Sequence, residues 1–114
     1  MAEEFKVIQK SYDFCKWLMD HTGKFPKSHR FSIAVRLENH FLEFLEKLTI
    51  ANHRKVKLPL LQAADEELLA VRLLIRLSHD QKFINTTSYE FASRSLDEIG
   101  RMLGGWLKQQ SGQK

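Results

Sequence analysis

The sequence predicts an all-α fold, an up-down-up-down antiparallel four-helix bundle in one domain over residues 1–114. Three observations predict this fold. Apolar residues recur at three- and four-residue steps in four stretches, glycine and proline are scarce, and no stretch alternates apolar and polar residues as a strand would. Because short connections join helices of about 20 residues, sequential neighbours should run antiparallel.

The first two helices are expected at about residues 3–22 and 29–53. Gly23 should end the first helix because glycine readily takes the left-handed conformation, and Pro26 prevents the helix from resuming. Ser28 can cap the second helix. The apolar stripe predicted for the first helix is Phe5, Ile8, Tyr12, Cys15 and Met19. The stripe predicted for the second is Ile33, Leu37, Phe41, Phe44, Leu48 and Ala51.

The last two helices are expected at about residues 59–80 and 88–109. Pro59 suits the first turn of the third, and Thr87 with Glu90 forms a capping box that opens the fourth. The third helix is apolar around much of its circumference, so we expect it to be buried on two sides. Its main line is Leu61, Ala64, Leu68, Val71, Ile75 and Ser78. The stripe of the fourth is Tyr89, Ala92, Leu96, Ile99, Leu103 and Trp106.

Composition limits the location of the chain. Cys15 is the single cysteine, so it cannot form an internal disulfide, and a lone thiol suits a reducing, cytoplasmic compartment. The strongest apolar run, residues 68–77, is interrupted by Arg72 and Arg76 and is far shorter than the roughly 20 residues that cross a bilayer. We therefore expect no membrane segment.

No residue pattern predicts catalysis, a metal or a cofactor. The five histidines include no pair four residues apart on one helix, and no cysteine pair accompanies them, so zinc spacing is lacking. The Gly104-Gly105 pair follows no strand, unlike a phosphate-binding loop; it indicates the end of the fourth helix or a close backbone approach. Cys15 is expected to be buried and inert. These observations predict a protein that is not an enzyme.

The charge distribution favours a polyanionic partner. Lysine and arginine number 18 against 14 acidic residues, a net charge of +4 that matters only if it is clustered. In the expected bundle the first and third connections meet at one end, and the second connection and the C-terminus meet at the other, so each end gathers cations. The predicted nucleic-acid contacts are Lys24, Lys27, Arg30, Arg54, Lys55 and Lys57, followed by Arg94, Arg101 and Lys108.

Plainer explanations exist for these residues. Arg94 and Arg101 follow Glu90 and Asp97 by four residues, a spacing that stabilises a solvated helix. The basic connection of residues 24–30 could be a solvated loop whose aromatic residue, Phe25, packs under the bundle instead of stacking on a base.

Excess apolar surface on the third helix also predicts contact with another protomer. Arg72 and Arg76 lie in an apolar neighbourhood that something should bury, and the glycine pair permits close packing. The predicted oligomer-interface residues are Leu69, Arg72, Leu73, Arg76, Gly104, Gly105 and Trp106.

Four segments together resemble the Avd family, the accessory variability proteins of diversity-generating retroelements in bacteria and phages. These segments are Lys24-Phe25-Pro26-Lys27-Ser28-His29-Arg30-Phe31-Ser32, Arg36-Leu37, Leu74-Ile75-Arg76-Leu77-Ser78-His79-Asp80 and Ile99-Gly100-Arg101-Met102-Leu103-Gly104-Gly105-Trp106. The Phe-Pro-Lys connection and the Gly-Gly-Trp ending are the more specific of them in combination, and the resemblance covers nearly the whole chain.

The resemblance implies a four-helix protomer in a barrel-shaped homopentamer with a positively charged surface. It also implies binding to the reverse transcriptase of the retroelement and to template RNA, complementary DNA or both, in support of mutagenic retrohoming. Four-helix proteins encoded by intervening sequences in ribosomal RNA genes are related to this family. A structural or protein-interaction module of that type is therefore the alternative function.

Overall fold

The computed structural model describes residues 2–112, and between them it contains helices but no strand. The four α-helices are α1 (Ala2–Thr22), α2 (Val35–Asn52), α3 (Leu58–Asp80) and α4 (Thr86–Gln110). A 3₁₀ turn, η1 (Lys27–His29), and a π-helical turn, η2 (Arg30–Ala34), lie between α1 and α2. The predicted all-α class is confirmed.

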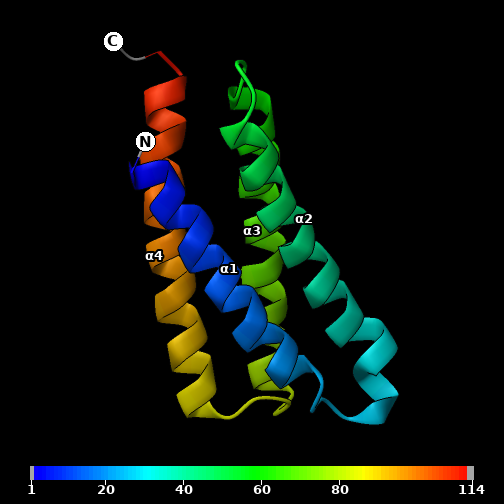
Figure 1. Ribbon diagram of the computed structural model, residues 1–114. Coiled ribbons are helices and arrows are strands. Elements are labelled where there is room, and N and C mark those ends of the chain that lie inside the picture. The colour runs from blue at the N-terminus through cyan, green and yellow to red at the C-terminus, as the bar shows by residue number, and fades with distance from the viewer. Residues whose placement is uncertain (1, 113–114) are drawn as a thin grey trace.

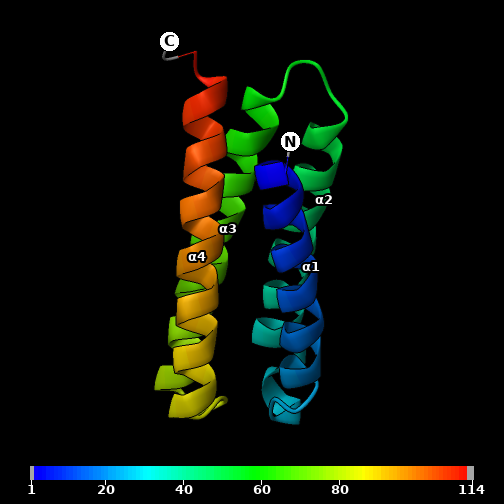
Figure 2. The same ribbon diagram turned by 60° about the vertical axis from the view of Figure 1, so that its left-hand side comes forward.

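The four helices pack lengthwise into an elongated body of 47 × 23 × 19 Å (Figure 1). Helices α1 and α3 each pack against both α2 and α4, and the α2–α3 contact is the most extensive. Figures 1 and 2 show the α1–α2 and α3–α4 connections at one end of the body, here called the first end. The α2–α3 connection and the end of α4 lie at the opposite end, here called the second end.

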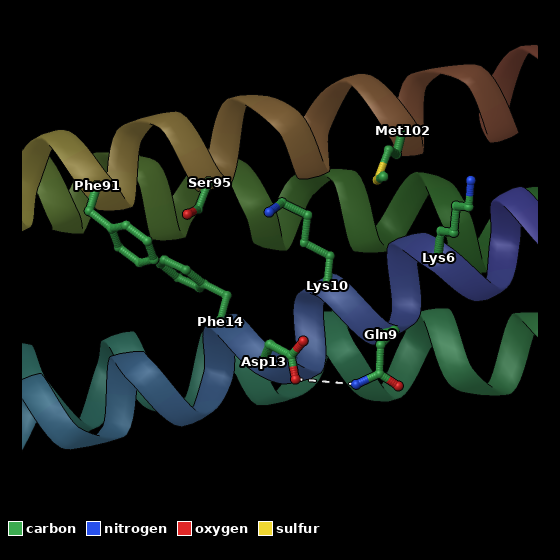
Figure 3. Close-up of a pocket in the computed structure, with 8 residues that line it drawn as sticks. All are labelled: Lys6, Gln9, Lys10, Asp13, Phe14, Phe91, Ser95 and Met102. Atoms are coloured by element: carbon green, nitrogen blue, oxygen red, sulfur yellow. Dashed lines mark hydrogen bonds between the residues drawn. The ribbon is translucent and has the colours of Figure 1, made fainter.

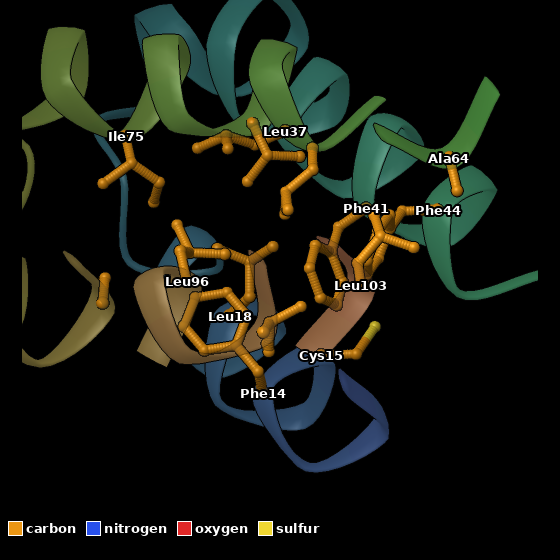
Figure 4. Close-up of a cluster of buried hydrophobic side chains, with 14 of the residues drawn as sticks. Phe14, Cys15, Leu18, Leu37, Phe41, Phe44, Ala64, Ile75, Leu96 and Leu103 are labelled. Atoms are coloured by element: carbon orange, nitrogen blue, oxygen red, sulfur yellow. The ribbon is translucent and has the colours of Figure 1, made fainter. Parts of the chain in front are cut away.

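The core consists of apolar side chains from all four helices (Figure 4). Phe41 lies at its centre, with its ring centroid 5.2 Å from that of Phe14 on α1 and 5.3 Å from that of Phe44. The predicted stripe of α2 is confirmed from Leu37 to Ala51, and its first member, Ile33, is half-buried on η2. The predicted line of α3 is fully buried, together with Leu74.

The predicted stripe of α1 was wrong at three of its five positions, whereas Cys15 is buried as expected and Ile8 is half-buried against the core. The buried face of α1 is formed by Val7, Ser11, Phe14, Cys15, Leu18 and Thr22. Phe5, Tyr12 and Met19, which recur every seven residues, are exposed instead. The reason is that α1 carries two overlapping apolar stripes, and the one with Phe14 and Leu18 reaches the aromatic residues of α2.

The start of the second helix also differs from the prediction. An α-helix was expected from residue 29 with Ser28 as its cap, but the chain passes through η1 and η2 before regular α-helix begins at Val35. No side chain caps η1, whose preceding residue, Pro26, has an extended backbone (φ −55°, ψ 142°). Proline fixes φ and lacks an N–H, so the chain re-enters helix through a tight turn.

The fourth helix begins at Thr86, two residues earlier than a Thr87 cap would allow. Asn85 is the N-cap, and its side-chain oxygen accepts a hydrogen bond of 2.8 Å from the Ser88 N–H. The predicted Thr87–Glu90 capping box was therefore wrong. Asn85 precedes it and accepts a hydrogen bond from one of the backbone N–H groups that lack a partner within the first turn of the helix. The helix continues through Gly104 and Gly105 to Gln110, so the glycines do not mark its end.

In the stretch from residue 2 to residue 112, no helix is both long and apolar enough to cross a membrane.

Candidate nucleic-acid interface

The first end presents exposed cations on two connections. Lys24 and Lys27 precede α2, and Lys82 lies in the α3–α4 connection; all three side chains are exposed. Arg30 is also exposed, and its guanidinium donates a hydrogen bond of 3.1 Å to the Gly23 carbonyl. Arginine has five N–H donors, so this bond leaves donors of Arg30 free for a phosphate.

Two phenylalanines of the first end have opposite roles. Phe25 is 2% exposed and packs against Phe83 with ring centroids 5.4 Å apart, as its alternative explanation required. His29 packs against the same Phe83 ring at 4.7 Å. Phe31, on η2, is 86% exposed. The sequence pattern singles out Phe25 as the aromatic residue of this connection and not Phe31, because Phe31 falls inside the predicted second helix.

Lys82 occupies an unusual backbone position. Its φ of +65° lies in the left-handed region, where a side chain is disfavoured relative to glycine. Its N–H bonds to the His79 carbonyl at 2.9 Å, and the next residue, Phe83, donates to the Ser78 carbonyl at 2.8 Å. These bonds end α3, and they place a lysine where glycine is the commonest residue.

The second end uses part of its charge within the chain. Lys57 directs its ammonium group to the last carbonyls of α2, with a distance of 2.9 Å to the Ala51 oxygen and further bonds to Asn52 and Arg54. A cation at this position stabilises the negative end of the helix dipole. Arg54 and Lys55 are exposed, and Val56 beside them is 71% exposed.

The predicted contacts on α4 lie on its outer surface. Arg94, Arg101 and Lys108 are all exposed. Asp97, which the four-residue spacing paired with Arg101, forms an ion pair with Arg72 of α3 instead. The ionic bond between α3 and α4 thus leaves Arg101 without a carboxylate partner among residues 2–112.

The predicted interface residues fall into two groups. Leu69 and Leu73 are 62% and 66% exposed on the outer face of α3, beside Arg72 and Arg76. Gly104 and Gly105 are exposed on α4, and a Cβ added to either would meet no atom within 4 Å in this chain. In contrast, Trp106 is 4% exposed and belongs to the core of the protomer, so its side chain is not on the surface.

A groove between α1 and α4 was not identified from the sequence (Figure 3). Phe14, Phe91 and Met102 supply apolar walls, and Lys6 and Lys10 lie along its α1 side. Lys10 forms an ion pair of 3.2 Å with Glu98 of α4, which ties the two helices together. Gln9 donates a hydrogen bond of 3.2 Å to Asp13 at the edge of the groove.

Titratable groups elsewhere are paired between or along helices. The His40 ring nitrogen Nδ1 lies 2.6 Å from Glu67 Oε1, which links α2 to α3. The Lys47 ammonium, 2.7 Å from the Glu43 carboxylate, lowers the pKa of Glu43.

Burial raises the pKa of the Cys15 thiol, with a smaller contribution from Glu38. Within residues 2–112, no three histidine, cysteine or acidic side chains are grouped so as to hold a metal ion.

These features define a class of protein, a small helical bundle with exposed cations at both ends and an uncovered apolar face on α3. The sequence profile described as bAvd-like matches residues 6–110, a span that includes most of every helix. The chain therefore belongs to the bAvd-like family, in agreement with the resemblance of its sequence to accessory variability proteins. No curated protein and no solved structure matches it.

Proposed function

We propose that this protein is a non-enzymatic accessory protein of a diversity-generating retroelement, which binds nucleic acid and the reverse transcriptase during mutagenic retrohoming. Membership of the bAvd-like family over residues 6–110 is the observation that carries this proposal. The exposed cations of the two ends support it, because nucleic-acid affinity depends on clustered positive charge that neutralises phosphates.

The proposed complex is a homo-oligomer, with a pentamer as the expected size. We propose that a second copy of this chain packs against the apolar face of α3. Helix α1 exposes Phe5, Tyr12 and Met19, and the two helices are separated by α2 and α4, so the two apolar faces point in different directions. Different faces that meet in a head-to-tail contact generate rings when the rotation closes.

Charge complements this proposed contact. Arg76 is exposed beside the leucines of α3, and the exposed carboxylates of Asp13 and Asp20 lie on α1 beside Tyr12 and Met19. An opposite-charge arrangement of this kind fixes the register of an interface more than it adds affinity. Five copies at +4 each would carry a net charge of +20, a strong target for a polyanion.

Substitution of Leu69 tests the assembly. Leu69→Glu should give a folded but smaller species by light scattering, because a charge is costly to bury without a partner. Asn39→Glu, at an exposed position of α2, is the matched control and should retain the mass of the wild type. A Leu69→Glu variant with unchanged mass would show that this face of α3 is not the contact.

Pairs of alanine substitutions test nucleic-acid binding. Lys24 with Lys27 represents the first end, Arg54 with Lys55 the second, and Lys6 with Lys16 on α1 is the control that removes the same charge. Either end pair should weaken binding of a structured RNA and reduce its salt dependence, with a slope change of about 0.7 to 0.9 per lost phosphate contact. Equal losses in all three variants would indicate a response to net charge alone.

The alternative is a structural or protein-interaction module of the ribosomal intervening-sequence type. The exposed leucines of α3 favour it, because an uncovered apolar face serves any protein partner. The gene neighbourhood distinguishes the two functions. A reverse transcriptase gene with a pair of near-identical repeats supports the retroelement function, and a position inside a ribosomal RNA gene supports the module.

A further inference from the structure

Phe31 is the most exposed of the large apolar side chains between residues 2 and 112. Single exposed apolar residues are common on protein surfaces and require no explanation by themselves. The surroundings of Phe31 are what make it informative. The residues from 23 to 32 include Lys24, Lys27 and Arg30 but no acidic residue, and all three cations are exposed.

The chain around Phe31 is held by several contacts. Phe25 anchors the connection in the core, and His29 rests against the Phe83 ring. The Arg30 guanidinium bonds across the connection to the Gly23 carbonyl. Phe31 is the second residue of the π-helical turn η2, and π-helical turns often lie at functional sites. The backbone that carries Phe31 is thus held by its neighbours, and the Phe31 ring contacts no other ring in the described chain.

An exposed aromatic face among cations fits one chemical class of partner. Unpaired nucleobases stack on aromatic side chains while the phosphates on either side contact lysine and arginine. Bases in a duplex are already stacked on each other and do not offer their faces. In a protein interface an aromatic anchor is usually surrounded by further apolar side chains. Near Phe31 in the sequence, the exposed side chains include Ser28 and Ser32 together with the cations.

We propose that Phe31 stacks on an unpaired base, and that the first end therefore binds single-stranded in preference to duplex nucleic acid. This inference rests on the proposed nucleic-acid-binding function. It adds that the nucleic acid bound at the first end is single-stranded and that Phe31 contacts its bases. The second end has the aliphatic Val56 in place of an aromatic ring, so it lacks the same means of discrimination.

The test compares binding of an unstructured 12-nucleotide RNA with that of a blunt 12-base-pair duplex, both measured by fluorescence anisotropy. Phe31→Leu keeps an apolar side chain but removes the aromatic face, and Phe31→Trp keeps the face. Phe31→Leu should weaken binding of the single strand by about 5- to 150-fold, since stacking contributes roughly 1 to 3 kcal/mol per base. Phe31→Trp should bind like the wild type, and binding of the duplex should be unaffected by either change.

Val56→Ala is the matched control, because it truncates an exposed apolar residue beside two cations at the second end. It should leave both affinities unchanged. Equal weakening of single strand and duplex by Phe31→Leu, or no weakening of either, would overturn the stacking proposal but leave nucleic-acid binding intact. Loss of reverse transcriptase capture with unchanged RNA affinity would assign Phe31 to a protein contact and overturn it as well. A wild type that binds neither RNA would overturn the proposed function itself.

Discussion

The two ends of the bundle carry similar positive charge but use it differently. At the first end the side chains of Lys24 and Lys27 form no hydrogen bond or ion pair with the rest of the described chain, and an exposed ring lies four residues beyond Lys27. At the second end the Lys57 ammonium donates to the carbonyls of Ala51 and Asn52, which close α2, and to the Arg54 carbonyl just beyond it. The comparison teaches that charge counted from a sequence overstates the charge available to a partner, because some cations serve as helix caps.

The largest expected effect is a difference in RNA affinity between the two ends. Alanine at Lys24 and Lys27 should weaken binding of single-stranded RNA about tenfold or more at 0.1 M salt, because two phosphate contacts are lost next to Phe31. Alanine at Arg54 and Lys55 should weaken it less. Filter binding over a range of salt concentrations measures both. The comparison would fail if the second-end variant had the larger loss.

A stability measurement separates the structural cation from its neighbour. Lys57→Ala should lower the free energy of unfolding by about 1 to 2 kcal/mol, because the carbonyls at the end of α2 lose a charged donor. Lys55→Ala, whose side chain is exposed and unbonded within the described chain, should change it by less than about 0.5 kcal/mol. Denaturant titration followed by circular dichroism compares the two. Equal effects would mean that Lys57 is no more structural than Lys55.

Lys82 sharpens the description of the first end. Lys82→Gly should stabilise the fold by about 1 kcal/mol, because glycine adopts a positive φ without steric cost. The same change should weaken RNA binding slightly if the charge of Lys82 contributes to the first end. Thermal unfolding and RNA titration of this variant give the two values. A less stable variant would contradict the assignment of strain to Lys82.

The smallest effect is expected at Cys15, which is buried in the core away from the cations of either end. Its thiol pKa is raised by burial, so the folded protein keeps the thiol protonated and should react slowly with iodoacetamide at pH 8. Above about pH 8.5 the unfolded thiol ionises first, and stability should therefore fall slightly as pH rises. Cys15→Ser would remove this pH dependence. Rapid labelling of the native protein would contradict the buried position.

Periodicity predicted the helices well where one stripe stood alone. In α2 and α4 one apolar line dominates, and its members from Leu37 to Ala51 and from Ala92 to Trp106 are buried as predicted, while Tyr89 is half-buried. In α1 two lines overlap, and periodicity could not choose between Tyr12 and Phe14 because the choice depends on the rings of α2. The exposed leucines of α3 were identified as surplus from the sequence, since one bundle core has no room for them.

The sequence predicted which cations gather at each end of the bundle. It did not predict which of them are used in contacts within the chain. Sequence alone grouped the cations by end, yet the use of Lys57 as a cap and the pairing of Asp97 with Arg72 depend on contacts between distant segments. Phe31 was missed because the π-helical turn that exposes it has no signature in apolar spacing. A proline followed by a basic stretch was the available signal, and it indicated a connection without indicating its geometry.

Light scattering in the presence of RNA tests the central claim, that an assembly of this chain binds nucleic acid through its cationic ends. The unstructured 12-nucleotide RNA is added at low and at high salt to the wild type and to the Lys24→Ala, Lys27→Ala variant. The account predicts a mass near five protomers that increases with RNA at low salt only, with a smaller increase in the variant. A monomer whose mass does not respond to RNA at either salt would contradict it.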